Sequence, residues 1–177
     1  MRQIEKNVSP MSNEGRNAYV IEHITIALLN LLREKAIEDI SISELCEQAG
    51  IGRASFYRNF NSKEDILRSY IHGIFQEWTA EGSQAENKPL SEFLHSLFAH
   101  FEKHRDFYEL LNQRNLIYLL KDVIIEICGP QPDQPKEEAY AKAYFSYALY
   151  GWIEVWFQRG MRETAEEIVG MFQSQGL

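Results

Sequence analysis

Cysteines, prolines and long apolar runs are all scarce in this sequence of 177 residues. The two cysteines, Cys46 and Cys128, lie in separate helical stretches without CxxC spacing, which favours buried, reduced thiols over a disulfide or a zinc site. No apolar run approaches the roughly 18 residues that a membrane span requires. The polar stretch 1–17 lacks the apolar segment of a secretory signal. These absences predict a cytoplasmic protein without a membrane segment.

Alternating polar and apolar residues, which would indicate half-buried strands, are also missing. Apolar residues recur instead at helical spacing, as in the stripe formed by Ile21, Ile24 and Leu28. Three of the five prolines fall in the segment GPQPDQP (129–135), which predicts a loop because proline cannot continue a helix. Apolar residues make up 45% of the chain, enough for a globular core and too many for disorder. The predicted fold class is therefore all-α.

Apolar spacing and helix caps predict about nine helices. A hydroxyl or amide residue followed three positions later by glutamate, the spacing of a capping box, marks helix starts at Ser41, Asn61 and Thr164. The chain is predicted to consist of a flexible arm (1–17), a helical head (18–72) and a helical body (73–177) that includes a polar linker at 82–89. The expected helices cover residues 18–35, a short segment ending at Gly50, 53–60, 63–81, 90–104, 106–113, 116–128, 136–159 and a last segment after Thr164.

The sequence has no excess of positive charge, and its formal net charge is -8. Residues 1–73 contain 9 Lys and Arg against 10 Asp and Glu, a net charge of -1, while the rest contains 9 against 16, a net charge of -7. An acidic body repels DNA, whereas a nearly neutral N-terminal part tolerates it. The charge distribution therefore permits nucleic-acid binding at the N-terminal end and does not by itself establish it.

The stretch GIGRASFYRNF, which begins at Gly50, places a glycine-containing turn between two short helices, the pattern of a helix-turn-helix. Phe56 and Phe60 lie four residues apart and are expected on the buried face of the second helix. Arg53, Tyr57 and Arg58 then point outward, where arginine can pair with guanine edges or phosphates. Spacing alone leaves a second interpretation open, namely a plain helical hairpin whose arginines and tyrosine are simply solvated.

The longer segment SISELCEQAGIGRASFYRNFNSKEDIL resembles the DNA-binding signature of the TetR/AcrR family of transcriptional regulators. The resemblance is strong over about residues 18–70, and beyond them it rests on the number and order of helices. It implies a three-helix DNA-binding head, a ligand-binding and dimerisation body, and a homodimer that reads a palindrome in double-stranded DNA. The residues that it places near DNA are Ser43, Arg53, Ala54, Ser55, Tyr57, Arg58, Asn59 and Lys63.

Within this resemblance Gly52 is a departure, because the family usually has serine or threonine at this position. Glycine is an acceptable N-cap that costs a few tenths of a kcal/mol relative to a hydroxyl residue. A hydroxyl that could face a phosphate is nevertheless missing, so we expect DNA affinity to be affected more than the fold.

The segment 136–159 is apolar on nearly all sides. Its two apolar faces include Tyr144 and Val155 on one side and Leu149 and Trp156 on the other. Such a helix needs cover on more than one side, which predicts an isologous homodimer, although a central helix buried in a monomer would show the same pattern. The predicted dimer interface comprises Trp152, Ile153, Trp156, Phe157, Ile168, Met171 and Phe172.

The resemblance also implies an effector cavity in the body, between the head and the dimer interface. Aromatic residues suit a pocket for an apolar effector, yet the same residues would serve equally well as ordinary core. His100 and His104 lie four residues apart, but no third ligand accompanies them, so neither a metal site nor a cofactor is predicted. The candidate pocket residues are Phe75, Trp78, Phe98, Phe101, Tyr108, Tyr118, Tyr144 and Tyr147.

The leading interpretation is a homodimeric repressor that a small-molecule effector releases from its operator. A second interpretation keeps the same fold but makes a protein partner, and not a metabolite, the signal that sets its activity. Enzymatic activity is not expected, since the sequence shows no Ser/His/Asp, Cys/His or paired-carboxylate grouping and no glycine-rich phosphate loop.

Overall fold

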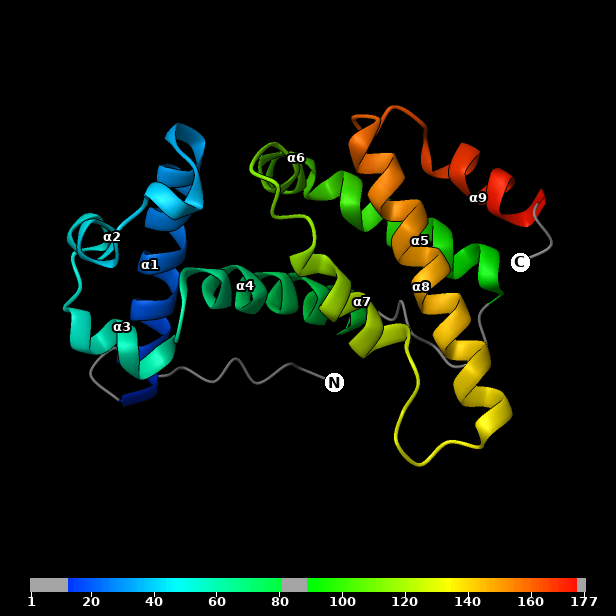
Figure 1. Cartoon of the computed structure of the whole chain (residues 1–177), viewed down its shortest axis with the longest axis horizontal. Helices are drawn as coiled ribbons and strands as arrows, with labels where there is room; N and C mark the ends of the chain where they lie inside the picture. The colour runs from blue at the N-terminus through cyan, green and yellow to red at the C-terminus, as the bar shows by residue number, and fades with distance from the viewer. Residues whose placement is uncertain (1–12, 81–88, 175–177) are drawn as a thin grey trace, which may run out of the picture. The chain divides into compact units, whose positions relative to one another are not determined.

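The computed structural model describes residues 13–80 and 89–174, and these contain nine α-helices and no strand, which confirms the all-α prediction (Figure 1). None of these helices has the length and hydropathy that crossing a membrane would require. The helices are α1 (Asn13–Glu34), α2 (Ile42–Ala49), α3 (Arg53–Asn59), α4 (Lys63–Trp78), α5 (Leu90–Lys103), α6 (Arg105–Gln113), α7 (Leu119–Cys128), α8 (Lys136–Gln158) and α9 (Ala165–Ser174).

The chain divides into two compact units, with the boundary between Tyr70 and Ile71, inside α4. α1 begins at Asn13, so the last five residues of the predicted arm are helical. The rest of that arm, and nearly all of the predicted linker at 82–89, lie outside the described residues. A short 3-10 helix, Ile37–Asp39, which the apolar spacing does not predict, connects α1 to α2.

The predicted capping boxes at α9 and α4 differ in how well they match the structure. At α9 the box is complete, because Thr164 Oγ1 accepts from the Glu167 amide at 3.2 Å and Glu167 Oε2 accepts from the Thr164 amide at 2.8 Å. At α4 the prediction of Asn61 with a glutamate is wrong by one residue. There Ser62 Oγ accepts from the Asp65 amide at 3.1 Å, and Asp65 Oδ2 accepts from the Ser62 amide at 3.1 Å. Because aspartate can close a box as glutamate does, spacing alone does not distinguish the two registers.

The N-terminal unit is built on α1, against which α2 and α3 both pack (Figure 1). Leu28 and Leu32 of α1, Leu45 of α2 and Phe56 of α3 are all fully buried. Burying a side chain of this size contributes about 1.5–3 kcal/mol, which compensates for the weak intrinsic stability of helices as short as α2 and α3. Packing on α1 therefore holds these two short helices at a defined angle.

The C-terminal unit has an aromatic core between α5, α6 and α8. Trp156 lies edge-on to Phe98 with ring centroids 5.0 Å apart, and Phe101 lies edge-on to Tyr108 at 4.9 Å. The turn from α8 to α9 is hydrogen-bonded to this core, since Trp156 Nε1 donates to the Glu163 carbonyl at 3.0 Å. α7 packs against α8, and α9 packs against α5. The inner face of α8 is therefore covered by the protein's own helices.

Candidate functional site

The turn between α2 and α3 is set by Gly50, which has φ 67° and ψ 28°, the left-handed conformation that favours glycine. Its amide hydrogen-bonds to the Glu47 carbonyl at 3.1 Å, and the Ile51 amide hydrogen-bonds to the Cys46 carbonyl at 3.0 Å, so the last turn of α2 is closed. α3 starts at Arg53, three residues after Gly50. The geometry is that of a helix-turn-helix with a tight turn.

α3 separates its residues into an inner and an outer face as predicted. Phe56 and Phe60 are buried, with ring centroids 6.2 Å apart. Tyr57 is 60% exposed and stands edge-on to Phe56 at 5.1 Å, so the buried ring supports the exposed one. Arg53 and Arg58 are exposed. Two guanidinium groups and a phenol therefore share the open surface of one short helix. Ala54 and, on α2, Ser43 are exposed as well, and Ser55 is half-buried.

This surface contains no acidic residue of its own. From Gln48 to Lys63 the sequence has three cationic residues and no aspartate or glutamate. In a chain with a net charge of -8, such a stretch is the part that an anionic polymer approaches at least cost.

Two residues predicted to contact DNA already have partners within the unit. The Lys63 ammonium donates to the carbonyl oxygens of Ile37 and Ile40, the latter at 2.7 Å, so at most one of its three N–H groups is left for a phosphate. Asn59 Nδ2 donates to the Ser55 carbonyl at 2.8 Å, which fixes the amide against its own helix. The Lys63 bonds depend on the 3-10 helix at residues 37–39, which apolar spacing could not predict.

Gly52 occupies the N-cap position of α3 with φ -76° and ψ 147°, and no side chain caps the helix there. A Cβ atom at this position would meet no other atom within 4 Å. The departure from the TetR/AcrR pattern is therefore not imposed by crowding, and a hydroxyl residue would fit.

The eight candidate pocket residues of the C-terminal unit differ in their exposure. Five of them are buried in the aromatic core, and Phe75, for example, contacts Trp78, His100 and Phe101 at centroid distances of 4.7–5.8 Å. The other three, Tyr118, Tyr144 and Tyr147, are exposed. Aromatic residues at helical spacing look alike in a sequence whether they pack inward or outward, and only neighbouring helices distinguish them.

The residues of the predicted dimer interface also differ in their exposure. Met171 is exposed and Trp152 is half-buried, whereas Ile153, Trp156, Phe157, Ile168 and Phe172 are buried, although Trp156 and Ile168 also border the groove between α8 and α9. The exposed side of α8 is instead its other apolar face. A row of residues at helical spacing forms it, and we call this row the α8 strip: Tyr140, Tyr144, Tyr147, Gly151 and Val155.

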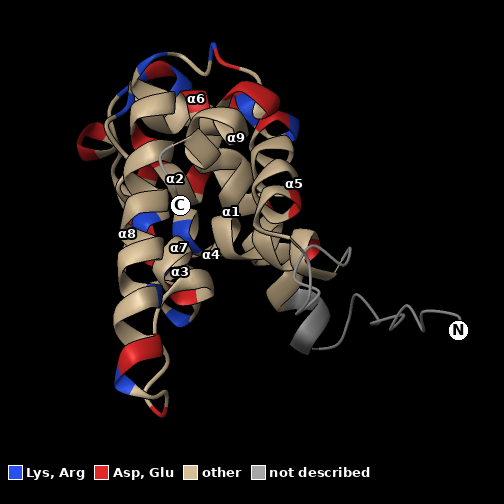
Figure 2. Cartoon of the chain, turned by 90° about the vertical axis from the view of Figure 1, so that its right-hand side faces the viewer, with Lys and Arg blue, Asp and Glu red and all other residues tan. Residues whose placement is uncertain are grey.

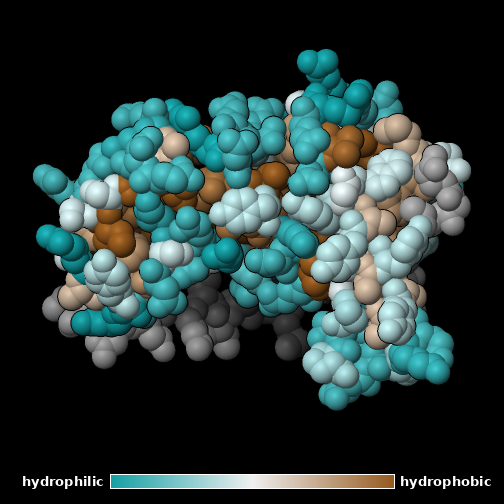
Figure 3. Space-filling model, in the orientation of Figure 1, coloured by the Kyte–Doolittle hydropathy of each residue, from teal (hydrophilic) through white to brown (hydrophobic). Residues whose placement is uncertain are grey.

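The α8 strip continues into an apolar groove between α8 and α9, with a volume of about 510 Å³. Gly151, Val155 and Met171 contribute to its walls, and the ion pair of Arg159 with Glu163 at 2.6 Å is part of the lining. Uncharged residues predominate along both helices (Figure 2). Weakly polar and apolar residues run along α8, while hydrophilic residues gather at its N-terminal end (Figure 3). The complete groove lining is Tyr147, Ala148, Gly151, Trp152, Val155, Trp156, Arg159, Glu163, Ile168 and Met171.

His100 is the one histidine that the structure places deep in the C-terminal unit, at 5% exposure. Its ring lies 4.7 Å from that of Phe75 and 4.9 Å from that of His104. Burial, together with the smaller effects of the nearby His104 and Lys103 charges, lowers the pKa of His100 to about 4. Its Nε2 has no hydrogen-bond partner among the described residues. His100 is therefore a neutral, buried polar group at neutral pH.

Comparison with known families agrees with this geometry. Residues 24–70, which contain the helix-turn-helix, match the family described as bacterial regulatory proteins of the tetR family. Residues 88–174 match the family described as the C-terminal region of transcriptional regulators, in a form named for TetR. The two matches cover most of the chain and fall on either side of the boundary inside α4.

Individual relatives are more distant. The HTH-type transcriptional regulator YerO of Bacillus subtilis (strain 168) is 30% identical over 104 residues, which span 54% of this chain and 36% of YerO.

Among solved structures, Lin0861 from Listeria innocua has a TM-score of 0.69 at 19% identity, over 95% of this chain and 94% of that one. A TetR transcriptional regulator from Streptococcus agalactiae 2603V has a TM-score of 0.62 at 18% identity, over 94% and 98% of the two chains. The dihydroxyacetone kinase operon activator DhaS has a TM-score of 0.52 at 18% identity, over 88% and 95%. At these identities the structures support the fold. With the family matches and the helix-turn-helix geometry, they place this chain in the TetR family as a DNA-binding transcriptional regulator.

Proposed function

We propose that the protein is a homodimeric repressor that binds a palindromic operator through α3 and is released from it by a small-molecule effector. The observation that carries the proposal is the exposed face of α3, where Arg53, Tyr57 and Arg58 surround a helix that is anchored by two buried phenylalanines. Arginine can pair with guanine edges or phosphates, and a tyrosine hydroxyl can donate to a phosphate.

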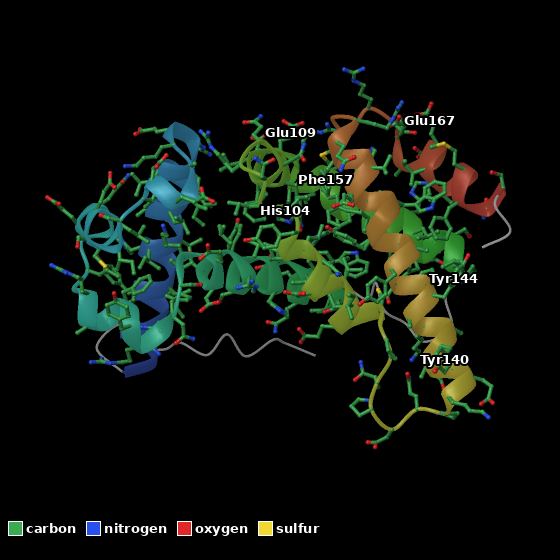
Figure 4. The ribbon with its side chains drawn as sticks, in the orientation of Figure 1. His104, Glu109, Tyr140, Tyr144, Phe157 and Glu167 are labelled. Carbon is green, nitrogen blue, oxygen red and sulfur yellow. The ribbon has the colours of Figure 1, made fainter. Side chains whose placement is uncertain are left out.

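The homodimer part of the proposal is supported by the α8 strip. Four side chains of one helix face, Tyr140, Tyr144, Tyr147 and Val155, are more than half exposed, and a groove of about 510 Å³ adjoins them. Figure 4 labels Tyr140 and Tyr144 on the N-terminal half of α8. Contiguous apolar surface of this kind marks an interaction site in a monomeric unit. Two copies related by a two-fold axis would present two α3 helices to successive turns of the major groove, roughly 34–36 Å apart.

The effector part of the proposal is supported by His100. A buried nitrogen without a hydrogen-bond partner costs about 1–3 kcal/mol, and a ligand that donates to it would recover that cost. The surrounding rings of Phe75, Trp78 and Phe101 suit an apolar or aromatic ligand. α4 carries Phe75 and Trp78 and begins in the N-terminal unit, so a ligand bound here would act on a helix that the two units share.

Selection of genomic DNA tests the proposal directly. Purified protein is incubated with sheared DNA of its source genome, and bound fragments are recovered and sequenced. Arg53→Ala and Tyr57→Ala are run alongside, with Arg33→Ala as a control that removes the same charge from α1 of the same unit. A few fragments that share a palindrome are the expected result. No enrichment over bulk DNA at moderate salt would contradict operator recognition and would favour activity that depends on a protein partner.

On the recovered operator, Arg53→Ala and Tyr57→Ala are each expected to weaken binding about tenfold or more. Loss of a base or phosphate contact costs about 1–3 kcal/mol, and 1.4 kcal/mol is a factor of ten. Titrations of each variant at one fixed salt concentration measure the effect. Arg33→Ala should bind within twofold of the unsubstituted protein. An equal loss in Arg53→Ala and Arg33→Ala, both of which remove one positive charge, would indicate non-specific charge attraction.

Gly52→Ser is expected to raise both the free energy of unfolding and the affinity for the operator. A serine hydroxyl would accept from a free amide of the first turn of α3, which stabilises the helix by a few tenths of a kcal/mol. The same hydroxyl can face a phosphate, so operator affinity should rise by about twofold to tenfold. Gly52→Ala separates the two effects, because alanine fits the site but has no hydroxyl. Equal affinity of the serine and alanine variants would contradict the phosphate contact.

The sign of regulation is read from a reporter driven by the promoter next to the operator. If the protein is a repressor, reporter expression rises when the gene for the protein is deleted. A fall would instead indicate an activator, the role that the name of the dihydroxyacetone kinase operon activator DhaS gives to that protein.

A further inference from the structure

Lys63 connects the first residue of α4 to the segment that leads into α2. Its ammonium donates to the carbonyl oxygens of Ile37, which begins the 3-10 helix, and of Ile40, which caps it. A carbonyl oxygen has two lone pairs, so Ile37 accepts from Lys63 and from the Ile40 amide at once. The side chains of both isoleucines are buried. The ammonium is therefore bonded to backbone that the core already anchors.

These hydrogen bonds enclose the whole helix-turn-helix. Ile40 directly precedes Ser41, the N-cap of α2, whose hydroxyl accepts from the Glu44 amide at 3.1 Å. At the other end, α3 stops at Asn59, only a short connection before Lys63. Ile40 and Lys63 are 23 positions apart, and α2, the turn and α3 all lie between them. The Lys63 ammonium thus holds the two ends of the helix-turn-helix together.

The start of α4 already has an anion of its own. Asp65 Oδ2 accepts from the amides of Asn61 at 3.0 Å and of Ser62 at 3.1 Å. Backbone amides at the start of a helix are the groups that otherwise attract a phosphate. Glu64 adds a second acidic residue in the same turn. A phosphate that approached Lys63 would therefore meet negative charge beside it, whereas the carbonyl oxygens offer the ammonium two acceptors without that repulsion.

We propose that Lys63 is a positioning residue for DNA recognition and not a phosphate contact. By joining the start of α4 to the residue before α2, it fixes the angle at which the helix-turn-helix presents Arg53 and Tyr57. Specific binding needs that angle, because hydrogen bonds to base edges weaken steeply when their geometry changes. Non-specific binding does not need it, because attraction to phosphates carries no sequence information. This inference rests on the proposed reading of an operator by α3.

Titrations of the operator and of an unrelated duplex of equal length, over a range of salt concentrations, test this role. Lys63→Met keeps a side chain of similar length but removes the ammonium. We expect its affinity for the operator to fall about tenfold or more, and its affinity for the unrelated duplex to stay within about threefold. On the unrelated duplex, the slope of log K against log salt concentration should stay unchanged. Loss of a phosphate contact would lower that slope by about 0.9 and weaken both duplexes alike, which would overturn the positioning role.

Arg33→Met is the matched control, because it makes the same replacement and removes one positive charge from α1 of the same unit. Its ratio of operator affinity to unrelated-duplex affinity should stay within about twofold of the unsubstituted value. An equal fall of this ratio in Lys63→Met and Arg33→Met would mean that charge alone is responsible, and it would overturn the proposal.

Hydrogen exchange shows whether the connection to the 3-10 helix is lost in a variant that is still folded. In Lys63→Met the Ile40 amide, which donates to the Ile37 carbonyl at 3.2 Å, should exchange about fivefold faster or more. The Ile51 amide, bonded to the Cys46 carbonyl at 3.0 Å, is the internal reference and should change by less than about twofold. Faster exchange at Ile40 without a fall in the affinity ratio would make Lys63 a purely structural residue and would contradict the positioning role.

The unsubstituted protein provides a measurement that does not depend on the folding of a variant. The nitrogen resonance of the Lys63 ammonium should be the same in the free protein and in the operator complex, since its carbonyl partners do not change. A resonance that shifts to that of a phosphate-bound ammonium would overturn the inference and leave operator recognition by α3 standing. Equal affinity of the unsubstituted protein for the operator and the unrelated duplex would overturn operator recognition and, with it, the role of Lys63.

Discussion

Replacing Trp156 with alanine is expected to lower the free energy of unfolding by about 4 kcal/mol. Trp156 is 1% exposed and packs against Phe98, Phe101 and Phe157. Its indole nitrogen also donates to the Glu163 carbonyl at 3.0 Å, so the substitution removes a ring from the core and a hydrogen bond from the α8–α9 turn. Urea unfolding followed by circular dichroism, at one fixed protein concentration, measures the loss.

Two further variants separate the causes of this loss. Trp156→Phe keeps a ring in the core but leaves the Glu163 carbonyl without its donor, and we expect it to cost about 1–2 kcal/mol. Tyr118→Ala removes a ring that is 48% exposed, and we expect a change below about 0.5 kcal/mol. Similar losses in Trp156→Ala and Tyr118→Ala would show that Trp156 does not anchor the C-terminal core.

The protein is expected to lose stability between pH 7.5 and pH 5 because of His100. Burial lowers the folded-state pKa of His100 to about 4, whereas an unfolded histidine has a pKa near 6.5. Below pH 6.5 this histidine therefore binds a proton in the unfolded chain, whereas it stays neutral in the folded chain until the pH nears 4. The stability that the neutral histidine allows is fully present above pH 6.5, declines as the pH falls, and reaches its lowest value below pH 4.

The expected loss from His100 is about 2 kcal/mol at pH 5 and about 3 kcal/mol once the pH falls below 4. The interval from pH 7.5 to pH 5 is the informative one. Hydrogen bonds hold the pKa values of carboxyl groups such as those of Asp65 and Glu163 below their ordinary values, which are 4.5 or less, so these groups stay ionised in it. Unfolding titrations at both pH values measure the difference.

His100→Leu is the control, because leucine is close to histidine in volume and cannot take up a proton. Between pH 7.5 and pH 5, the free energy of unfolding of the variant should fall by about 2 kcal/mol less than that of the unsubstituted protein. At pH 7.5 the variant should be as stable or slightly more so, since it removes a buried nitrogen without a partner. An identical pH dependence in both proteins would contradict the burial of His100.

Much of the candidate DNA-binding site could be predicted from the sequence. Gly50 and the Phe56–Phe60 spacing are local signals, because a left-handed turn needs glycine and residues four apart share a helix face. The bonds from Lys63 to the 3-10 helix could not be predicted, since they join residues more than 20 positions apart. The sequence therefore predicts which side chains α3 presents, and tertiary contacts determine how many of them are free for DNA.

By itself the sequence determined the all-α class, the order of the helices and the helix-turn-helix, because each follows from spacing within a few turns of the chain. Only the tertiary structure decided which face of α8 is exposed. α8 is apolar on nearly all sides, so its own periodicity points in no single direction. One face packs on the aromatic core around Trp156, and the Tyr140–Val155 face stays exposed. Burial of a helix that is apolar all round depends on what its neighbours cover, and spacing along one helix does not contain that information.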